Sequence, residues 1–400
     1  MMKKPYLIAA LCTLSLTQAQ AAGLYLYEIG SEDLGLASAG AAARAMDSST
    51  IFSNPAGLTR IDGDRVDTGL QLLFGNTSYH ITDGVASGDD PGNVLQPFPG
   101  GSLFYSHSVN ERLKIGLGFW GNFGLALHYG DWAGSALVKD ATQLALTIQP
   151  TIAYRLNDQW SIGGGIGINY GYFALNRSTA RGEALENDHD WEPNLRVGLL
   201  FEPNTATRFG LNYASQAKYD FQINPNVTFQ LPATGQIHNI SIPLETQVNA
   251  PQQLMLSAYH QVAPEWAIMG NVGWQDWSAF NHNQSAIYGE VIASKPLYQD
   301  TLHLAVGAQY QANSQWRYNF GMAYDSSMYK DQSQGVLTTP SGETWRFGTG
   351  LTYQLDQVST LGFAAEYARV QSNKAPNHLF GGEFDTGHLY FLSSQYSRKF

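Results

Sequence analysis

The residues best suited to chemistry in this 400-residue chain are acidic side chains that alternate along positions 186–192. Oxygen and imidazole ligands of this kind suit a divalent cation, although the same run is also typical of a solvated loop. The ten histidines include no HExxH pattern, so we assign no metal ligand and predict no cofactor. The acidic run consists of Glu186, Asp188, His189, Asp190 and Glu192.

Catalytic signals are weak elsewhere in the chain. The only cysteine, Cys12, lies in the N-terminal targeting segment, and no positioned Ser/His/acid set is evident, so we assign no catalytic residue. The glycines of 163–171 resemble a phosphate-binding loop, but they lie inside a predicted strand and no helix follows them. Small side chains facing a lumen are the preferred interpretation. No Walker-type loop is present, so nucleotide hydrolysis would not drive transport.

Two backbone-breaking segments are more informative. Asn54, Pro55 and Ala56 end a segment rich in small residues, and Pro55 removes a hydrogen-bond donor where the chain turns. The residues Gly121, Asn122, Phe123 and Gly124 interrupt a predicted strand, and glycine inside a strand often marks a bulge or bend. In lipid an unpaired backbone group is costly, so such a break must line a cavity or meet another element.

The N-terminus predicts a secretory signal at residues 1–21, with Lys3 and Lys4 before an apolar run and cleavage before Ala22. The net charge is −11, which argues against nucleic acid as a partner. Only 14% of residues are charged, against about 25% in ordinary soluble domains. The mature chain has no apolar run long enough for a helical span, so the composition favours a transmembrane β-barrel over a secreted soluble β-protein.

Period-2 alternation supports the barrel. In 160–172 the even positions are mostly apolar, with aromatic residues at both ends, and the odd positions are small or polar. This pattern predicts a strand with one face toward lipid and one toward the lumen. We count about fourteen such strands, each near the ~10 residues that a tilted span requires. Their predicted centres are Leu70, Phe104, Leu117, Ile148, Ile166, Val197, Leu211, Leu256, Val272, Val306, Phe320, Thr349, Phe363 and Phe391.

The connections alternate between tight turns, such as 110–113 and 312–315, and longer polar loops, such as 83–99 and 179–190. Short periplasmic turns and long outer loops are typical of outer-membrane barrels, and an even strand count leaves both termini in the periplasm. The chain ends in Phe400 on an aromatic strand, as barrel-assembly signals do, although Arg398 takes a place that is usually apolar. We therefore predict a hatch at residues 22–62, plugging an all-β, 14-stranded antiparallel transmembrane barrel at residues 63–400.

The sequence resembles the FadL family of outer-membrane transporters of long-chain fatty acids and hydrocarbons. The resemblance covers essentially the whole mature chain, and it depends on an ordered set of individually weak motifs. These are Ala22-Gly23-Leu24, Ser53-Asn54-Pro55-Ala56, Asn122-Phe123-Gly124-Leu125-Ala126, Ala153-Tyr154-Arg155-Leu156-Asn157 running to Trp160, Tyr213 to Phe221, and Ala250-Pro251 through Pro264-Glu265-Trp266-Ala267-Ile268 to Trp277-Ser278.

The resemblance implies an apolar ligand site inside the barrel and sideways release through a kink in the third strand. The family's Asn-Pro-Ala, which belongs to the hatch and its gate, falls on Asn54, Pro55 and Ala56, and its kink glycine falls on Gly124. Basic residues near a ligand carboxylate would fall on Arg177 and Lys295. The loop at 179–190 is shorter than in the fatty acid transporters, which puts an outer capture groove in doubt.

The leading function is therefore passive uptake of long-chain fatty acids, and uptake of uncharged or aromatic hydrocarbons is the alternative. A non-transporting enzyme or adhesin barrel is the third possibility, and a general porin fits poorly because a hatch would obstruct it. The expected partners are hydrophobic small molecules, outer-membrane lipid and lipopolysaccharide, and the barrel-assembly machinery. We expect a monomer.

Overall fold

A computed structural model of the chain describes residues 25–84, 88–179, 182–224, 226–230, 237–241, 244–282, 285–287, 290–292, 297–377 and 379–400. The predicted signal segment, residues 22–24 and Lys295 lie outside these ranges. Among the helices in the described ranges, none has the length and apolar character needed to cross a membrane.

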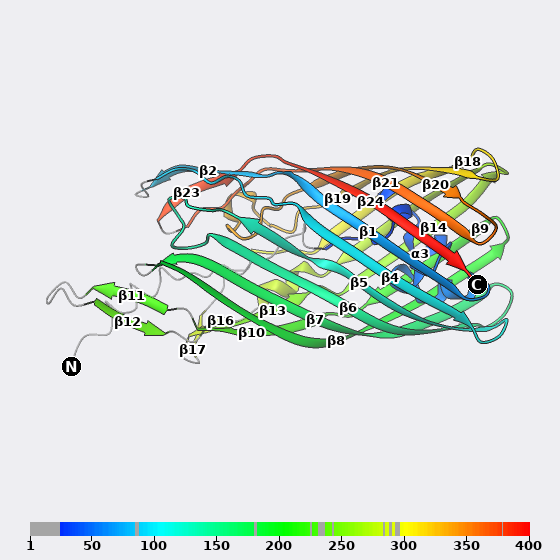
Figure 1. Cartoon of the computed structure of the whole chain (residues 1–400), viewed down its shortest axis with the longest axis horizontal. Coiled ribbons are helices and arrows are strands. Elements are labelled where there is room, and N and C mark those ends of the chain that lie inside the picture. The colour runs from blue at the N-terminus through cyan, green and yellow to red at the C-terminus, as the bar shows by residue number, and fades with distance from the viewer. Residues whose placement is uncertain are drawn as a thin grey trace.

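The main body is a closed barrel of fourteen strands, and every neighbouring pair is antiparallel (Figure 1). Each of the fourteen predicted strand centres lies in one of these strands, which confirms the predicted fold class. The strands are β1 (Arg65–Asn76), β4 (Phe98–Ser108), β5 (Leu113–His128), β6 (Asp140–Arg155), β7 (Trp160–Thr179), β8 (Gly182–Asn204), β9 (Thr207–Ala214), β14 (Gln253–Ala263), β15 (Trp266–Gln275), β18 (Thr301–Gln311), β19 (Trp316–Asp325), β20 (Thr344–Gln354), β21 (Ser359–Val370) and β24 (Gly387–Lys399).

Alternation explains why these segments form a barrel. In β7 the even positions Ile162, Ile166 and Ile168 are exposed on the outer surface, whereas Ser161 and Asn169 are buried on the inner side. The same alternation between outward and inward residues runs around the wall. Lipid can cover the outer face, and closure leaves no unpaired sheet edge.

Six tight connections between wall strands lie at one end of the barrel, which we call the turn end, and the other connections, including the one between β7 and β8, lie at the opposite end, the loop end (Figure 1). In five of the turns a side-chain oxygen accepts two backbone N–H groups a few residues ahead, which is the usual way for Asn and Asp to favour a turn. The five residues are Asn110, Asn157, Asn204, Asn313 and Asp356.

The predicted polar loop at 179–190 is wrong in extent, because β7 continues to Thr179 and β8 begins at Gly182. The two strands pair continuously from Thr179↔Gly182 to Trp160↔Phe201. The prediction recognises strands by alternating apolar and polar residues. The tip of this hairpin is mostly polar on both faces, so it lacks that pattern. Strand pairing requires only backbone groups, so the polar ladder extends beyond the apolar band.

The remaining long connections contain short sheets and helices that gather at the loop end (Figure 1). One sheet has the order β10-β13-β16-β17, a second has β22-β23-β2-β3, and β11 pairs with β12. Their bounds are β2 (Ser78–Gly84), β3 (Gly92–Asn93), β10 (Ala217–Ile223), β11 (Asn226–Gln230), β12 (Ile237–Ser241), β13 (Leu244–Ala250), β16 (Ser285–Ile287), β17 (Glu290–Ile292), β22 (Asn373–Lys374) and β23 (Phe380–Phe384), with 3-10 helices η3 (Trp277–His282) and η4 (Gln332–Gln334).

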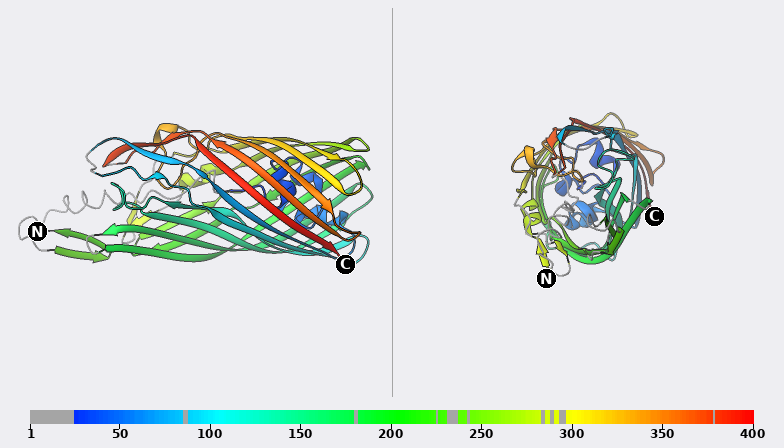
Figure 2. Two further views of the ribbon diagram at one scale, coloured as in Figure 1. Left: turned by 45° about the horizontal axis from the view of Figure 1, so that its top comes forward. Right: turned by 90° about the vertical axis from the view of Figure 1, so that its left-hand side faces the viewer.

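The N-terminal hatch lies inside the ring of strands, as the view along the barrel axis shows (Figure 2). It consists of α2 (Ser31–Gly35), α3 (Ala41–Arg44), α4 (Thr50–Ser53) and η2 (Pro55–Arg60). Its small residues, including Ala37, Ala39 and Ala42, are completely buried. Short helices without large side chains bring the hatch backbone directly against the wall, so the predicted plug is observed.

Candidate functional site: a plugged lumen with an interrupted wall

The wall is interrupted in β5, at the predicted kink. The pairing of β5 with β6 shifts register between Gly121 and Phe123, and Gly124 has φ +156°. A Cβ at Gly124 would lie 2.7 Å from the carbonyl oxygen of Gln143, so a larger residue would strain the pairing there. The extra residue reverses the alternation: Trp120 faces inward before the shift, and Phe123 and Leu127 face inward after it. This is the behaviour of a β-bulge.

On its other side, β5 separates from β4. Their pairing ends at Ser102↔Trp120. Beyond that point the described residues include two isolated bridges to β5, one from Tyr25 at the start of the hatch to Phe123 and one from Leu95 to Leu127. The hatch therefore supplies backbone contact to the interrupted strand, as the cost of unpaired backbone in lipid requires.

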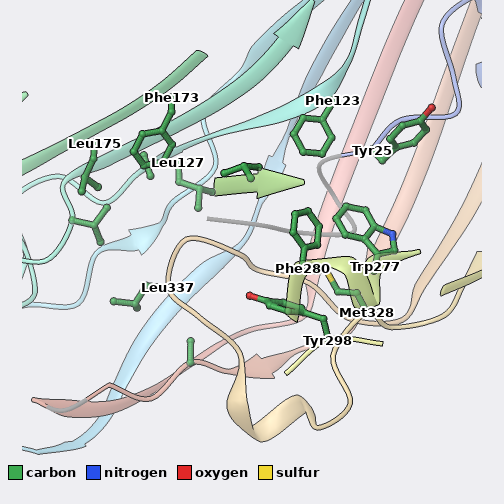
Figure 3. Close-up of a cluster of buried hydrophobic side chains, with 14 of the residues drawn as sticks. Tyr25, Phe123, Leu127, Phe173, Leu175, Trp277, Phe280, Tyr298, Met328 and Leu337 are labelled. Carbon is green, nitrogen blue, oxygen red and sulfur yellow. The ribbon is translucent and has the colours of Figure 1, made fainter. Parts of the chain in front are cut away.

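Next to the break lies a large cluster of buried apolar side chains, which we call the loop-end cluster (Figure 3). It combines the start of the hatch, β5, β6, β7, β10, β13 and the loop-end connections. Aromatic rings stack within it, as between Phe173 and Phe221, whose centroids are 5.7 Å apart. Its members include Tyr25, Tyr27, Phe123, Leu127, Phe173, Leu175, Phe221, Trp277, Phe280, Tyr298, Met328 and Leu337.

At the turn end, Asn54 of the predicted gate fastens the hatch to the wall. Its Nδ2 donates to the carbonyl oxygens of Ala42 (2.6 Å) and Leu199 (3.0 Å), and its Oδ1 accepts from the N–H of Ala56 (3.1 Å). Pro55 begins η2, where a missing N–H is tolerated. One buried amide thus caps a helix, joins two parts of the hatch and contacts β8.

Wall side chains donate to hatch carbonyls in several further places. Arg196 donates to Phe52 (2.7 Å), Arg208 to Ala43 (2.9 Å) and Arg155 to Thr59 (2.8 Å). The Arg208 guanidinium also lies 3.7 Å from the ring centroid of Tyr259. These contacts satisfy hatch carbonyls that its short helices leave unpaired.

A buried group of charges, the lumen ion cluster, joins the hatch to β18–β21. Arg346 Nε donates to Asp325 (2.8 Å), and its Nη1 lies 3.2 Å from Glu366 and 3.5 Å from Glu28 of the hatch. His303 contacts Asp325 through Nδ1 (2.7 Å) and Ser38 of the hatch through Nε2 (2.8 Å). Because the Asp325 carboxylate accepts from Nδ1–H, the Ser38 hydroxyl donates to Nε2 when the imidazole is neutral.

The structure places only one of the two predicted carboxylate ligands. Arg177 is buried in β7, and its Nε and Nη2 each lie 3.3 Å from the Glu186 carboxylate. Lys295 lies outside the described residues, so the predicted Arg177–Lys295 pair stays a prediction. The acidic residues that follow Glu186 are also engaged, because Asp188 and Asp190 accept N–H groups of Gln222 and Asp220 in β10.

These hydrogen bonds and the Arg177–Glu186 ion pair give the acidic run a structural role in place of the cation site that its sequence allowed. Glu186, Asp188, Asp190 and Glu192 share the inner face of β8, and His189 lies on the opposite face. Within the described ranges, no three His, Cys, Asp or Glu side chains are arranged to hold a metal ion. Here the acidic side chains join β8 to β7 and β10.

Sequence reasoning missed the lumen ion cluster and the pairing of Tyr25 with Phe123. Arg346 and Glu366 occupy inward positions on otherwise ordinary strands, and a charge at such a position was the one signal that could have revealed them. Their partner Glu28 is more than 300 residues away in sequence, so the pattern could not identify it. The Tyr25–Phe123 bridge also joins distant segments.

Together, fold and site define a transmembrane β-barrel that is plugged by its own N-terminal segment and interrupted in one strand. Over residues 12–387 the sequence matches the family model described as "Outer membrane protein transport protein (OMPP1/FadL/TodX)". The chain belongs to this family of outer-membrane transport proteins. Its members are transport channels, so the protein is not an enzyme.

Known relatives and solved structures agree with this assignment. The chain is 25% identical over 393 residues to the long-chain fatty acid transport protein of Salmonella typhi, covering 90% of each chain. It shares the fold of a Pseudomonas aeruginosa FadL homologue, with TM-score 0.80 and 19% identity over 95% of this chain and 100% of that one. The Pseudomonas putida toluene transporter TodX superposes with TM-score 0.71 and 14% identity, over 94% and 99%.

Proposed function

We propose that this protein takes up long-chain fatty acids passively across the outer membrane and releases them sideways through the break in β5. The observation that carries the proposal is the separation of β4 from β5 after Ser102↔Trp120, beside a buried apolar cluster. The function of the Salmonella relative, long-chain fatty acid transport, supports the choice of substrate. The C-terminus would then face the periplasm at the turn end, whereas the first described residue, Tyr25, lies in the loop-end cluster. A periplasmic N-terminus stays a prediction, and a monomer placed by the barrel-assembly machinery would suffice.

The energetics favour a sideways exit for such a passenger. Each buried methylene contributes about 0.8 kcal/mol, so a ~16-carbon tail would gain up to ~12 kcal/mol in apolar surroundings. A charged hydrogen bond to the head group adds only about 1.5–3 kcal/mol. Release into periplasmic water would forfeit the gain from burying the tail, whereas escape into the bilayer preserves most of it.

The route through the lumen from the loop-end cluster to the turn end is unfavourable for the hydrocarbon tail of a fatty acid. The hatch fills the turn end with polar contacts such as those of Asn54, and the lumen ion cluster, near the loop-end limits of β18–β21, is polar as well. At the break, by contrast, the hatch covers β5 through Tyr25, which makes a strand-like bridge to Phe123. A small displacement of 25–27 would uncover the edge of β5 without unseating Asn54, so we propose this segment as the gate.

Uptake of labelled oleate against toluene tests the proposal in cells that lack their own transporter and express this protein. We expect oleate uptake well above that of cells carrying an empty vector. Toluene uptake without oleate uptake would instead identify a hydrocarbon channel. Uptake of neither compound would contradict transport of both classes.

A substitution at the break tests the sideways route. Gly124→Arg should block oleate uptake at least tenfold while the barrel still assembles, because the side chain would occupy the break. Gly92→Arg is the matched control: Gly92 also has a positive φ, but a Cβ there would meet nothing within 4 Å. Normal uptake by the Gly124 variant would remove the lateral route.

One observation favours the second candidate, an uncharged or aromatic hydrocarbon. The Arg177 guanidinium already binds the Glu186 carboxylate, so a ligand carboxylate would have to displace that residue. If Arg177 and Lys295 do hold the head group, Arg177→Ala with Lys295→Ala should weaken oleate binding. Unchanged oleate binding would remove the carboxylate role of these two residues.

A further inference from the structure

The side chain of Gln143 is anomalous among the polar residues that face the lumen. It belongs to β6 and is 2% exposed. Neither its Oε1 nor its Nε2 makes a hydrogen bond to any described residue. A buried primary amide can donate two hydrogen bonds and accept two, and leaving all of them unmade is unfavourable. Such a group calls for a functional explanation.

The position of Gln143 is set by the interrupted wall. In the strand ladder it lies opposite Leu125 of β5, directly beyond the register shift, and opposite Phe173 of β7. Its inward-facing neighbours on β6 are Ala141 and Ala145, both buried. The amide therefore projects from the wall into the loop-end cluster, beside the place where β5 leaves β4.

The surroundings of this amide are apolar. Ala141, Ala145 and Phe173 belong to the loop-end cluster, and Leu125 packs against it. The nearest positive side chains along β7 and at the start of β6 are Arg177, four residues beyond Phe173, and Lys139, four residues before Gln143. Arg177 is paired with Glu186, and Lys139 is paired with Asp131 and Glu183. The site therefore offers one donor group and one acceptor to a passenger in surroundings that strongly disfavour an ion.

We propose that Gln143 binds the head group of a fatty acid in its protonated, neutral form as the passenger reaches the break. The acid O–H donates to the amide Oε1, and the amide Nε2–H donates to the acid C=O, so both unpaired groups are satisfied by one molecule. A carboxylate has no proton to donate and would face Oε1 with like charge. The inference rests on the proposed function and specifies the chemical form of its substrate.

Protonation at this point has a physical rationale. Moving a carboxyl group out of water disfavours its charged form, so the acid takes up a proton from the outer solution before it enters the apolar region. The neutral form is also the one that can pass into hydrocarbon. Gln143 would thus select acids that are already in the form the bilayer accepts, at the last step before the wall opening.

The test compares a long-chain acid with an alkane of equal length. Gln143→Leu keeps the approximate volume and removes the amide, and loss of two hydrogen bonds should slow oleate uptake about tenfold. Uptake of the alkane should be unchanged or faster. Gln309→Leu is the matched control, because Gln309 is also a buried lumen-facing amide but lies in β18, where it donates to Asn319 (3.0 Å). It should leave the acid-to-alkane ratio at the wild-type value.

The outcomes separate the two proposals. Wild-type cells that take up no oleate would contradict the proposed function itself. Normal wild-type uptake with an unchanged acid-to-alkane ratio in Gln143→Leu would overturn only the role of Gln143, and so would a parallel loss of both substrates. If Gln143→Leu fails to assemble, Gln143→Met keeps the length of the side chain, removes both amide groups and should lower the same ratio.

Spectroscopy provides an independent measurement on the purified wild-type protein. Carboxyl-labelled ¹³C oleic acid bound to the barrel in detergent should give the NMR shift of a protonated acid, and this signal should be lost in Gln143→Leu. A bound species that shows only the carboxylate shift in the wild type would overturn the inference.

Discussion

The hatch helices and the loop-end cluster occupy the same lumen but are held by different interactions. The hatch is fastened by directional contacts, such as those of Asn54 and Arg346, and by close backbone approach to wall glycines such as Gly321. The loop-end cluster is held mainly by apolar side chains, and one buried amide within it, Gln143, lacks a partner among the described residues.

This difference indicates how one lumen can both seal and conduct. Hydrogen bonds and ion pairs weaken steeply when their geometry changes, so the hatch resists small displacements. Apolar packing is not directional, so an apolar ligand can replace contacts between side chains with contacts of its own. On the proposed route, the seal and the passage therefore belong to different layers of contacts. Substitutions in the two layers should then have different consequences.

The largest effect is expected at the lumen ion cluster. Arg346→Leu would leave Glu28, Asp325 and Glu366 buried without their shared cation, and breaking a buried ion pair in this way costs about 3–5 kcal/mol. Urea unfolding of the barrel in lipid vesicles, followed by tryptophan fluorescence, measures the loss. Arg369→Leu, an exposed position on β21, should change the free energy of unfolding by less than about 0.5 kcal/mol. Equal effects would show that the cluster does not stabilise the hatch layer.

A cavity in the loop-end cluster should have a different consequence. Leu337→Ala removes a buried side chain and should lower the free energy of unfolding by about 2–5 kcal/mol. Because the hatch contacts remain intact, uptake of hydrophilic antibiotics should stay at the wild-type level. Increased antibiotic uptake in this variant would mean that the two layers are not independent.

A single methyl group at the hatch–wall contact should break the seal. In Gly321→Ala the new Cβ would collide with the Leu36 carbonyl, and overpacking of this kind costs about 1–3 kcal/mol. We expect the hatch to shift and antibiotic uptake to rise. Gly101→Ala is the control, because the atom nearest to its new Cβ would be the carbonyl oxygen of Gly69, at 3.5 Å. A sealed Gly321 variant would contradict the rigidity of the hatch layer.

The smallest effect concerns pH and the sheet β22-β23-β2-β3 at the loop end. Hydrogen bonding to Asp90, together with Asp385, raises the pKa of the His80 imidazole above its usual value. A raised folded-state pKa means that this pair stabilises the sheet fully at pH values below the unfolded pKa of about 6.5 and less as pH rises through the folded pKa. His80 is half exposed, so solvent screening keeps the effect well below about 1 kcal/mol. Amide hydrogen exchange in β2 and β23 should accelerate with rising pH in the wild type beyond the intrinsic change, and this excess should vanish in His80→Ala.

Much of the architecture was predictable because alternation is a local property. A strand that faces lipid on one side and a lumen on the other must alternate wherever it crosses the apolar band, so the centres Leu70 to Phe391 were all recognised. The bulge was predictable for the same reason, because a change of phase after Trp120 is visible in the sequence. The hairpin at 179–190 was predicted as a loop because its residues are mostly polar and do not alternate between apolar and polar.

The partners of the inward-facing residues depend on the tertiary structure. Arg346 meets Glu28 and Tyr25 meets Phe123 because barrel closure brings the hatch and these wall positions to the same height in the lumen. Arg177 meets Glu186 because of the register of the β7–β8 hairpin. The relative position of two distant strands depends on the pairing register of every strand pair between them. A shift of one residue in that register would turn a wall side chain to the other face. The sequence by itself therefore determined a plugged barrel with one interrupted strand. Only the closed structure decided which buried charges are paired and which buried amide, at Gln143, has no partner among the described residues.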